Sequence, residues 1–551
     1  MAREKDGSHG GEEETGWAAI SRSSNGASSA AAAALAACIL AVAATLAGAD
    51  DPYRFFTWNV TYGSINPLGS TPQQGILING QFPGPRIDCV TNDNIIVNVF
   101  NNLDEPFLLT WNGIKQRKNS WQDGVLGTNC PIPPGANYTY KFQAKDQIGT
   151  FVYFPSVAMH RAAGGFGALN VPAPAIPVPY PPPAGDFTLL VGDWYKAGHK
   201  QLRQALDAGG GGALPPPDAL LINGMPSAAA FVGDQGRTYL FRVSNVGGHS
   251  LRLVEVEGTH PVQNVYDSLD VHVGQSVAFL VTLDKAAQDY AVVASARFSP
   301  GAAPLMATGT LHYSSAVSRA PGPLPAPPPE QAEWSMNQAR SFRWNLTASA
   351  ARPNPQGSFH YGTIATSRTL VLANSAPVLA GQRRYAVNGV SFVLVDNYNI
   401  ANVIGWDSVP ARPDGAAPRS GTPVVRLNLH EFIEVVFQNT ENELQSWHLD
   451  GYDFWVVGYG NGQWTENQRT TYNLVDAQAR HTVQVYPNGW SAILVSLDNQ
   501  GMWNLRSANW DRQYLGQQLY MRVWTPQQSF SNEYSIPTNA ILCGRAAGLG
   551  H

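Results

Sequence analysis

The pattern of apolar and polar residues predicts short β-strands along most of the chain. Residues 95–100 read Ile-Ile-Val-Asn-Val-Phe and residues 435–437 read Val-Val-Phe, and each run leads into an Asn-rich turn. Residues 279–283 and 290–294 are two more apolar runs, which we expect to be a pair of core strands. The long 3.6-residue periodicity of amphipathic helices is missing. The pattern therefore predicts an all-β protein.

A short motif recurs three times in the sequence. Ile78-Asn79-Gly80 returns as Ile222-Asn223-Gly224 and again as Val387-Asn388-Gly389. Asn-Gly between apolar segments is a strong signal for a tight turn. Because each copy comes early in its part of the chain, the motif predicts three related β-sandwiches.

Two proline-rich stretches separate these parts. Seven prolines lie between Pro172 and Pro183, and six lie between Pro321 and Pro329. Such segments cannot continue a central strand or a helix, so we expect extended linkers. The predicted domains are residues 50–171, 186–316 and 334–543.

The N-terminal residues 1–49 are predicted to be a secretory signal with a long leader. Residues 30–47 are apolar, and Ala47-Gly48-Ala49 is typical of a cleavage site. The alternative is an uncleaved signal anchor. Elsewhere no apolar stretch reaches the ~18 residues of a membrane span, and the C-terminal tail is too short and polar for a lipid-anchor signal.

Composition and sequons agree with a soluble, secreted glycoprotein. The formal net charge is −5 and only 14% of residues are charged, so we expect no nucleic-acid partner. N-glycosylation sequons begin at Asn59, Asn137 and Asn345. Once the signal is removed, an odd number of cysteines remains: Cys89, Cys130 and Cys543.

Three segments closely resemble the copper-binding segments of ascorbate oxidase and laccase. They are residues 109–113, 150–156 and 447–459. Further runs resemble the plant SKU-type (skewed-growth) branch of ascorbate-oxidase-like proteins, which includes pollen-specific members. These runs are residues 119–134, 270–276, 351–362 and 503–506, whereas residues 81–85 resemble the first-domain signature of plant multicopper oxidases. The resemblance implies three cupredoxin-like Greek-key β-sandwich domains, secretion to the cell wall or apoplast, and a role in directional cell expansion or pollen tube growth.

Most of the copper ligands of that family are absent. A multicopper oxidase holds its blue copper with two His, a Cys and a weak axial Met, and its three-copper cluster with eight imidazoles. The aligned positions here are Thr110, Asn112, Phe154, Ser156, Gln445, His448, Asp450, Arg506, Ser507, Ala508, Arg512 (a blue-copper His in the family) and Gln517 (the axial Met). Only His448 keeps an imidazole, and none of the twelve His forms a His-x-His pair. We therefore expect no bound copper, no other cofactor and no catalytic residue; copper is implied by family inheritance alone.

Two functions remain after this comparison. The first is a non-catalytic extracellular protein that binds a wall glycan or another protein. Its aromatic residues could stack on sugars, although they could equally fill the sandwich cores; the tryptophans considered are Trp447, Trp455, Trp464, Trp490, Trp503, Trp510 and Trp524. The alternative is a copper-dependent oxidoreductase of the ascorbate oxidase or laccase type with an atypical site. A hydrolase finds no support, because no Gly-x-Ser-x-Gly motif is present.

The resemblance also predicts long-range contacts. In ascorbate oxidase the positions of Cys130 and Cys543 form a disulfide, which would leave Cys89 as a buried, inert thiol. The family cluster draws ligands from the first and third domains, so these two domains should pack against each other. His160, beside the second segment, is expected to be structural or surface-exposed.

The vacated copper cluster needs a replacement for the lost charge and volume. Asp450 and Arg506 fall on positions that converge on one cluster in the family. We expect them to form an ion pair, with Phe154 filling imidazole volume nearby, because an unpaired buried charge is costly. The alternative is that Arg506 turns to solvent while Asp450 binds backbone amides.

Overall fold

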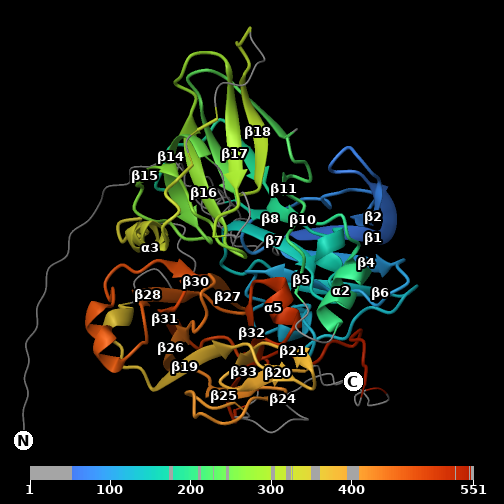
Figure 1. The fold of residues 1–551 in the computed structure, drawn as a ribbon, viewed down its shortest axis with the longest axis vertical. Helices are drawn as coiled ribbons and strands as arrows, with labels where there is room; N and C mark the ends of the chain where they lie inside the picture. The colour runs from blue at the N-terminus through green and yellow to red at the C-terminus, as the bar shows by residue number, and fades with distance from the viewer. Residues whose placement is uncertain are drawn as a thin grey trace, which may run out of the picture. The chain divides into compact units, whose positions relative to one another are not determined.

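The computed structural model describes most of the chain after the predicted signal (Figure 1). The described residues are 52–172, 178–208, 213–227, 229–243, 247–298, 304–317, 324–325, 327–348, 360–393, 409–527, 529–544 and 547. Residues 53–551 form one compact unit. The predicted signal at 1–49 and most of the motif at 351–362 lie outside the described residues, as do parts of both proline-rich stretches.

The first domain is built from two four-stranded sheets. One has the order β2-β1-β4-β6 and the other β3-β8-β7-β5. The strands are β1 (Tyr53–Ile65), β2 (Gln73–Ile78), β3 (Ile87–Asp88), β4 (Asn94–Asn101), β5 (Leu109–Asn112), β6 (Asn137–Gln143), β7 (Gly149–Pro155) and β8 (Gly167–Val171). Two 3-10 helices, η1 (Ser120–Gln122) and η2 (His160–Ala163), lie in the connections. Alternate residues of β4 are buried, as expected for a strand with one face on a core.

The second domain contains a large sheet with the order β12-β18-β17-β14-β16-β13-β9, to which β15 adds beside β14. Its elements, with the separate β10-β11 pair and helix α2, are β9 (Asp186–Leu189), β10 (Val191–Trp194), α2 (His199–Asp207), β11 (Ala219–Ile222), β12 (Ala229–Gly233), β13 (Thr238–Val243), β14 (Gly247–Val256), β15 (Val265–Ser268), β16 (Val277–Thr282), β17 (Asp289–Ser295) and β18 (Met306–Tyr313). The apolar runs at 279–283 and 290–294 form β16 and β17. They are not direct neighbours, because β14 pairs with both and lies between them.

The third domain has two main sheets, with the orders β24-β23-β22-β19-β26-β31-β28-β29 and β25-β33-β32-β27-β30. Its strands are β19 (Arg368–Ser375), β20 (Val378–Leu379), β21 (Gln382–Arg383), β22 (Ala386–Val387), β23 (Val390–Phe392), β24 (Arg419–Gly421), β25 (Val424–Asn428), β26 (Phe432–Gln438), β27 (Gln445–Leu449), β28 (Phe454–Asn461), β29 (Ala479–Arg480), β30 (Thr482–Val485), β31 (Gly489–Ser496), β32 (Gly501–Ser507) and β33 (Gln518–Trp524). The helical elements are α3 (Ala332–Ser341), η3 (Tyr361–Thr363), η4 (Glu466–Thr471) and α5 (Trp510–Tyr514). Strands thus dominate all three domains, as the apolar pattern predicted.

The repeated Asn-Gly motif performs the same structural task in each domain. Asn79, Asn223 and Asn388 all adopt a left-handed backbone, with φ of 51°, 50° and 45°. Each side-chain oxygen accepts a backbone N–H from a preceding strand or its end, at 2.7, 2.8 and 2.8 Å. Each amide nitrogen donates to the carbonyl two residues earlier in that segment, at 3.0, 3.0 and 2.8 Å. Three copies of one turn, with one set of contacts, support the predicted internal repeat.

Aromatic side chains mainly fill the sandwich cores. Of the seven tryptophans considered for sugar binding, the buried ones are Trp447, Trp455, Trp464, Trp490 and Trp503. Trp510 packs edge-on against Tyr195, and the guanidinium of Arg426 covers the ring of Trp524. Exposed rings include those of Tyr53 and Phe55, which stack on each other in β1.

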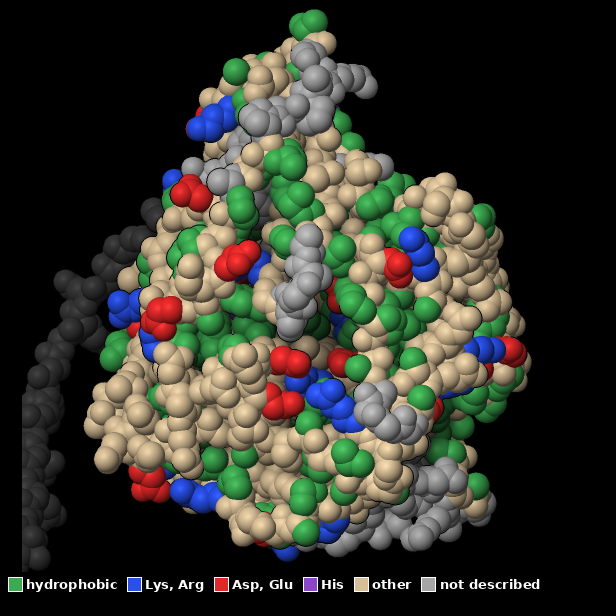
Figure 2. All heavy atoms as spheres, viewed as in Figure 1, with side chains coloured by type: hydrophobic (Ala, Val, Ile, Leu, Met, Phe, Trp, Pro, Cys, Tyr) green, Lys and Arg blue, Asp and Glu red, His purple; other side chains and the backbone are tan. Residues whose placement is uncertain are grey.

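The surface and the described helices bear on two further expectations. On the face shown in Figure 2, basic and acidic side chains lie interspersed, and no broad basic patch is visible on that face. Within the described residues, no helix combines the length and the apolar character that crossing a membrane requires.

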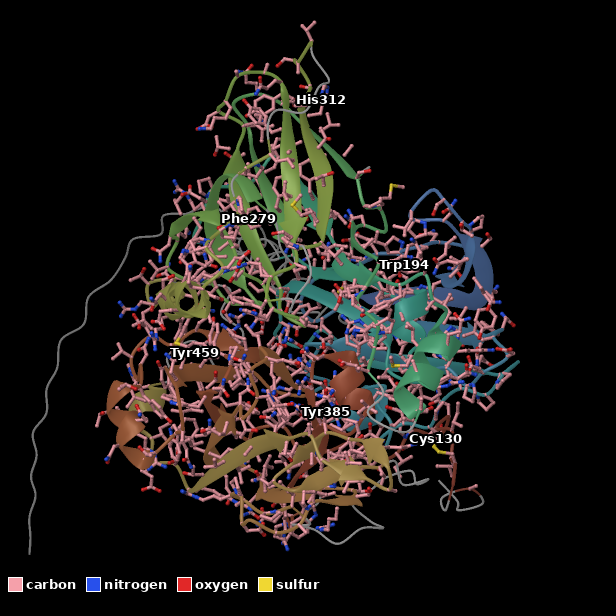
Figure 3. All side chains as sticks on the ribbon, in the orientation of Figure 1. Cys130, Trp194, Phe279, His312, Tyr385 and Tyr459 are labelled. Atoms are coloured by element: carbon pink, nitrogen blue, oxygen red, sulfur yellow. A yellow bond between two sulfur atoms is a disulfide. The ribbon has the colours of Figure 1, made fainter. Side chains whose placement is uncertain are left out.

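The first and third domains are joined directly, as predicted. Cys130 forms a disulfide with Cys543, with a Cα–Cα distance of 5.9 Å (Figure 3). Lys115 Nζ lies 2.6 Å from a carboxylate oxygen of Asp453, and the amide of Asn499 donates to the Lys115 carbonyl at 2.9 Å. Cys89 is free and buried, as expected.

Candidate functional site

The segments that resemble copper-binding segments form two strand pairs, one in each of these joined domains. In the first domain β5 and β7 are antiparallel, and Thr110 lies opposite Phe154. In the third domain β27 and β32 are antiparallel, and His448 lies opposite Arg506. The polar residues of these strands are buried because the strands lie in domain interiors and at a domain junction.

Asp450 and Arg506 form a buried ion pair, which confirms the predicted pairing of these two residues. Each side chain is only 2% exposed, so the alternative in which Arg506 turns to solvent is wrong. His448 Nε2 lies 3.0 Å from the other oxygen of Asp450. Burial alone would raise the pKa of Asp450, but Arg506 and the hydrogen bond from His448 hold it well below its usual range.

Asp123 is a second buried carboxyl group at this centre, and the sequence did not single it out. It directly follows η1 and is 1% exposed. Burial, followed by the nearby charge of Asp450, raises the pKa of Asp123 well above its usual range. The opposite directions of these two pKa shifts favour a single carboxylate charge beside Arg506.

The first-domain positions are not arranged to bind a metal. Ser156 Oγ donates to the Gly124 carbonyl at 2.6 Å, and the Asn112 amide reaches the Gly274 carbonyl at 3.4 Å. The guanidinium of Arg161 lies 4.1 Å from the centre of the Phe154 ring. Phe154 is buried, but no contact between its ring and the Asp450–Arg506 pair is established, so its volume-filling role stays a prediction.

The remaining positions, which would surround a blue copper, form a hydrogen-bond network instead. Gln517 Nε2 donates to Gln445 Oε1 at 2.6 Å, and Arg512 Nη1 reaches Gln517 Oε1 at 3.2 Å. Arg512 also pairs with Glu441 at 2.7 Å and Glu443 at 2.5 Å. The structure thus brings Gln445, Arg512 and Gln517 together, although none of these three side chains is of a kind that binds copper well. Ser507 accepts a backbone N–H from residue 509, and Ala508 has no donor atom in its side chain.

Copper does not fit this set of residues. Copper prefers imidazole, thiolate and thioether ligands, whereas a guanidinium stays protonated and offers no lone pair. Arg506 and Arg512 occupy two of the ligand positions, and Asp450 is already neutralised by Arg506. Burial lowers the pKa of His448 to about 4, so its imidazole is neutral, but one imidazole cannot replace the missing ligands.

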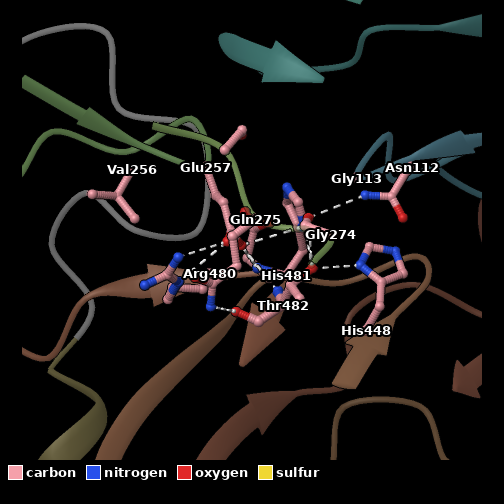
Figure 4. A network of polar contacts seen from close by, with 12 residues as sticks. Asn112, Gly113, Val256, Glu257, Gly274, Gln275, His448, Arg480, His481 and Thr482 are labelled. Atoms are coloured by element: carbon pink, nitrogen blue, oxygen red, sulfur yellow. Dashed lines mark hydrogen bonds and ion pairs between the residues drawn. The ribbon is translucent and has the colours of Figure 1, made fainter. Parts of the chain in front are cut away.

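Polar side chains from the third domain connect His448 to a second histidine (Figure 4). His448 Nδ1 lies 2.8 Å from Thr482 Oγ1, which lies 3.1 Å from His481 Nδ1. The Thr482 hydroxyl also donates to the Gly274 carbonyl at 3.2 Å, and His481 Nδ1 also lies 3.3 Å from Glu257, so both contacts link this group to the second domain.

At the other end of this hydrogen-bond network lies Glu257 of the second domain (Figure 4). Its carboxylate pairs with Arg480 at 2.9 Å and accepts the backbone N–H groups of His481 at 2.6 Å and Thr482 at 2.9 Å. Both side chains of the Glu257–Arg480 pair are at most 2% exposed. Together with the contact from Asn112 to the Gly274 carbonyl, this network joins all three domains at the former ligand segments.

Sequence reasoning missed Asp123, His481 and Glu257 because none lies in a segment aligned with metal ligands. The surface-exposed alternative for His160 is wrong, because this side chain is completely buried. Asp123 lay within a conspicuous motif at residues 119–134, which could have identified it as a candidate.

Comparisons with known proteins agree with the fold and with the segments described above. Three family models described as multicopper oxidase match residues 59–175, 185–316 and 391–529. The chain is 50% identical to the L-ascorbate oxidase homolog of Nicotiana tabacum, over 91% of this chain and 95% of that protein. It is 48% identical to the monocopper oxidase-like protein SKU5 of Arabidopsis thaliana, over 91% of each.

A solved structure has the same fold at low sequence identity. Fet3p, described as a multicopper oxidase that functions in iron import, superposes with a TM-score of 0.72 at 19% identity. The match covers 88% of this chain and 93% of Fet3p. At that identity the likeness shows the three-domain cupredoxin architecture alone.

Proposed function

Because the chain belongs to the multicopper oxidase family, we propose that it is a secreted, glycosylated member that acts without copper catalysis. Its place of action is the plant cell wall or apoplast, in directional cell expansion or pollen tube growth. The buried Asp450–Arg506 ion pair carries this proposal, since it puts a permanent cation where the family has a copper ligand. A guanidinium there repels a metal ion as well as failing to bind one.

Binding, rather than redox chemistry, is the activity that we propose for this protein. The partner is a wall glycan or an extracellular protein. Five of the seven tryptophans considered are buried, so exposed rings such as those of Tyr53 and Phe55 are better placed to stack on a sugar. Asn59 and Asn137 are exposed, and Asn345 is partly exposed, which supports glycan attachment at the three sequons.

Metal analysis of the secreted protein tests the proposal directly. The protein is produced with copper in the medium and without a metal-binding tag, and an ascorbate oxidase is prepared in parallel as the positive control. Elemental analysis should find no copper at the former cluster, and oxygen uptake with ascorbate or a phenol should equal the blank. Three or four copper ions per chain, or a blue absorption band with oxygen uptake, would overturn the proposal.

The alternative is a copper-dependent oxidoreductase with an atypical site. It is favoured by the retained His448 and by His481, whose rings lie 5.2 Å apart. His481 Nε2 is buried and has no hydrogen-bond partner within the described residues. An oxidase built around these two imidazoles should lose its activity when His448 is replaced by Gln, which keeps polar atoms in the same space.

A complementation experiment separates the two functions in the plant. Wild-type protein and the His448→Gln variant are expressed in a line that lacks the gene, and cell expansion or pollen tube growth is measured against protein abundance. Non-catalytic function predicts equal rescue at equal abundance. Failure of the variant at wild-type abundance would favour the oxidoreductase. Pull-down of wall glycans and proteins with the intact secreted chain then identifies the partner.

A further inference from the structure

A second group of metal-ligand side chains lies away from the segments that align with copper ligands. It consists of Glu105, His160 and His199, whose donor atoms all lie within 4.8 Å of one another. Glu105 lies between β4 and β5, and His160 begins η2, both in the first domain. His199 begins α2, which belongs to the second domain and packs against η2. The group therefore sits where these two domains meet.

One oxygen of Glu105 is the common point of this group. Glu105 Oε2 lies 2.7 Å from His199 Nε2 and 3.5 Å from His160 Nε2. Ligands at ~2.0–2.2 Å from a tetrahedral Zn²⁺ are about 3.3–3.6 Å apart. The three atoms therefore need only small movements to surround one ion.

His160 is the observation that points to a ligand. Its side chain is 0% exposed, and neither ring nitrogen has a hydrogen-bond partner among the described residues. Buried polar groups nearly always have such a partner.

Neighbouring rings fix the two imidazoles in place. The Phe107 ring stacks on His160 with centroids 5.8 Å apart, and the Tyr62 ring stacks on His199 at 6.1 Å. The Tyr62 hydroxyl also lies 3.3 Å from Glu105 Oε2. Ring orientations are thus set before any ion binds, which reduces the entropic cost of binding.

Two cations near Glu105 have to be reconciled with a metal ion. Arg203 Nη1 binds the other carboxylate oxygen, Oε1, at 2.8 Å, so it orients Glu105 and leaves Oε2 facing the imidazoles. Lys200 Nζ lies 3.7 Å from Oε2, but its side chain is 41% exposed and can turn to solvent.

We propose that Glu105, His160 and His199 bind one divalent transition ion of the zinc type, which links the first domain to the second. Two imidazoles and one carboxylate make a set that suits Zn²⁺, with a fourth position left for water. The proposal is independent of the former copper cluster. It predicts one ion per chain, whereas the family's catalytic centre predicts three or four coppers.

Calorimetric titration of the full secreted chain with Zn²⁺ tests the site. The protein is first treated with a chelator and freed of any tag. We expect one Zn²⁺ per chain, no comparable binding of Mg²⁺, and a raised thermal unfolding midpoint with Zn²⁺. Substituting Co²⁺ should give the visible absorption of a tetrahedral N/O site.

His199→Gln and Glu105→Gln should each weaken Zn²⁺ binding at least about tenfold. The matched control is His312→Gln, which removes another His that pairs with a carboxylate, Asp289 at 2.5 Å, elsewhere in the second domain. Circular dichroism confirms that each variant is folded. The proposal is overturned if wild-type protein binds no stoichiometric Zn²⁺, or if His199→Gln and Glu105→Gln bind it as tightly as His312→Gln does.

Discussion

The buried Asp450–Arg506 pair allows a quantitative test of how this buried polar centre is stabilised. In Arg506→Met, Asp450 keeps the hydrogen bond from His448 but loses its counter-charge. Removing one partner of a buried pair costs about 3–5 kcal/mol of unfolding free energy. Asp450→Asn should cost a similar amount, since Arg506 then loses its ionised partner and keeps neutral contacts such as the Asn504 side chain at 3.3 Å.

The double variant Asp450→Asn/Arg506→Met separates pairing from burial. It leaves no unpaired charge, and the amide introduced at position 450 still offers an oxygen to His448. We therefore expect a loss of no more than about 2 kcal/mol, smaller than that of either single variant. A non-additive result of this sign is what a specific ion pair requires.

The pH dependence provides an independent check. In the wild type the pKa of Asp450 lies below that of the unfolded chain, ~3.9. Its contribution to stability is therefore present above that pH and is lost as the pH falls toward the folded pKa. Without Arg506, burial raises the pKa of Asp450 above ~3.9, and the carboxyl group then destabilises the fold increasingly as the pH rises. The loss caused by Arg506→Met should thus grow between pH 4.5 and 7.5, by at most about 1.4 kcal/mol per pH unit.

Urea unfolding, followed by tryptophan fluorescence at several pH values, measures these losses. The control is Arg412→Met, which breaks the exposed pair with Glu466 and should cost less than about 1 kcal/mol at any pH in this range. The reasoning is refuted if Arg506→Met costs no more than this control. It is equally refuted if the double variant is less stable than both single variants.

Three further predictions concern other features of the fold. Cys543→Ser should remove the bridge to Cys130 and destabilise the chain by about 2–5 kcal/mol, measured by urea unfolding of a variant with an intact Cys89. Asn388→Ala should cost about 2–4 kcal/mol, and Asn79→Ala less, because both lose the same turn contacts but Asn388 is buried and Asn79 is exposed; equal losses would contradict this account. Burial raises the pKa of Cys89 to about 12, so a thiol reagent at pH 8 should label it only after unfolding, and rapid labelling of native protein would show that it is accessible.

The sequence was most informative where structure is determined locally or by alignment with known segments. The Asn-Gly turns were predicted because a left-handed Asn followed by Gly is a local requirement of the turn. The Asp450–Arg506 pair was predicted because both residues align with ligands that converge on one cluster. The first prediction needed only two adjacent residues, and the second needed the alignment of two distant segments.

Contacts between distant segments were harder to predict. The insertion of β14 between β16 and β17 depends on long-range strand pairing, which the apolar pattern does not encode. Asp123 comes from a loop of the first domain, and its raised pKa depends on Asp450 in the third. His160 and His199 likewise lie on separate domains, so only the folded chain shows that they share Glu105.

The residues at the positions aligned with copper ligands bear on what joins the first domain to the third. In the family, a cluster with ligands from both domains makes that connection, whereas the Asp450–Arg506 pair lies entirely within the third domain. The connection here therefore depends on direct bonds: the Cys130–Cys543 disulfide and the buried Lys115–Asp453 pair. Because these bonds involve none of the positions aligned with copper ligands, they join the two domains whichever residues stand at those positions.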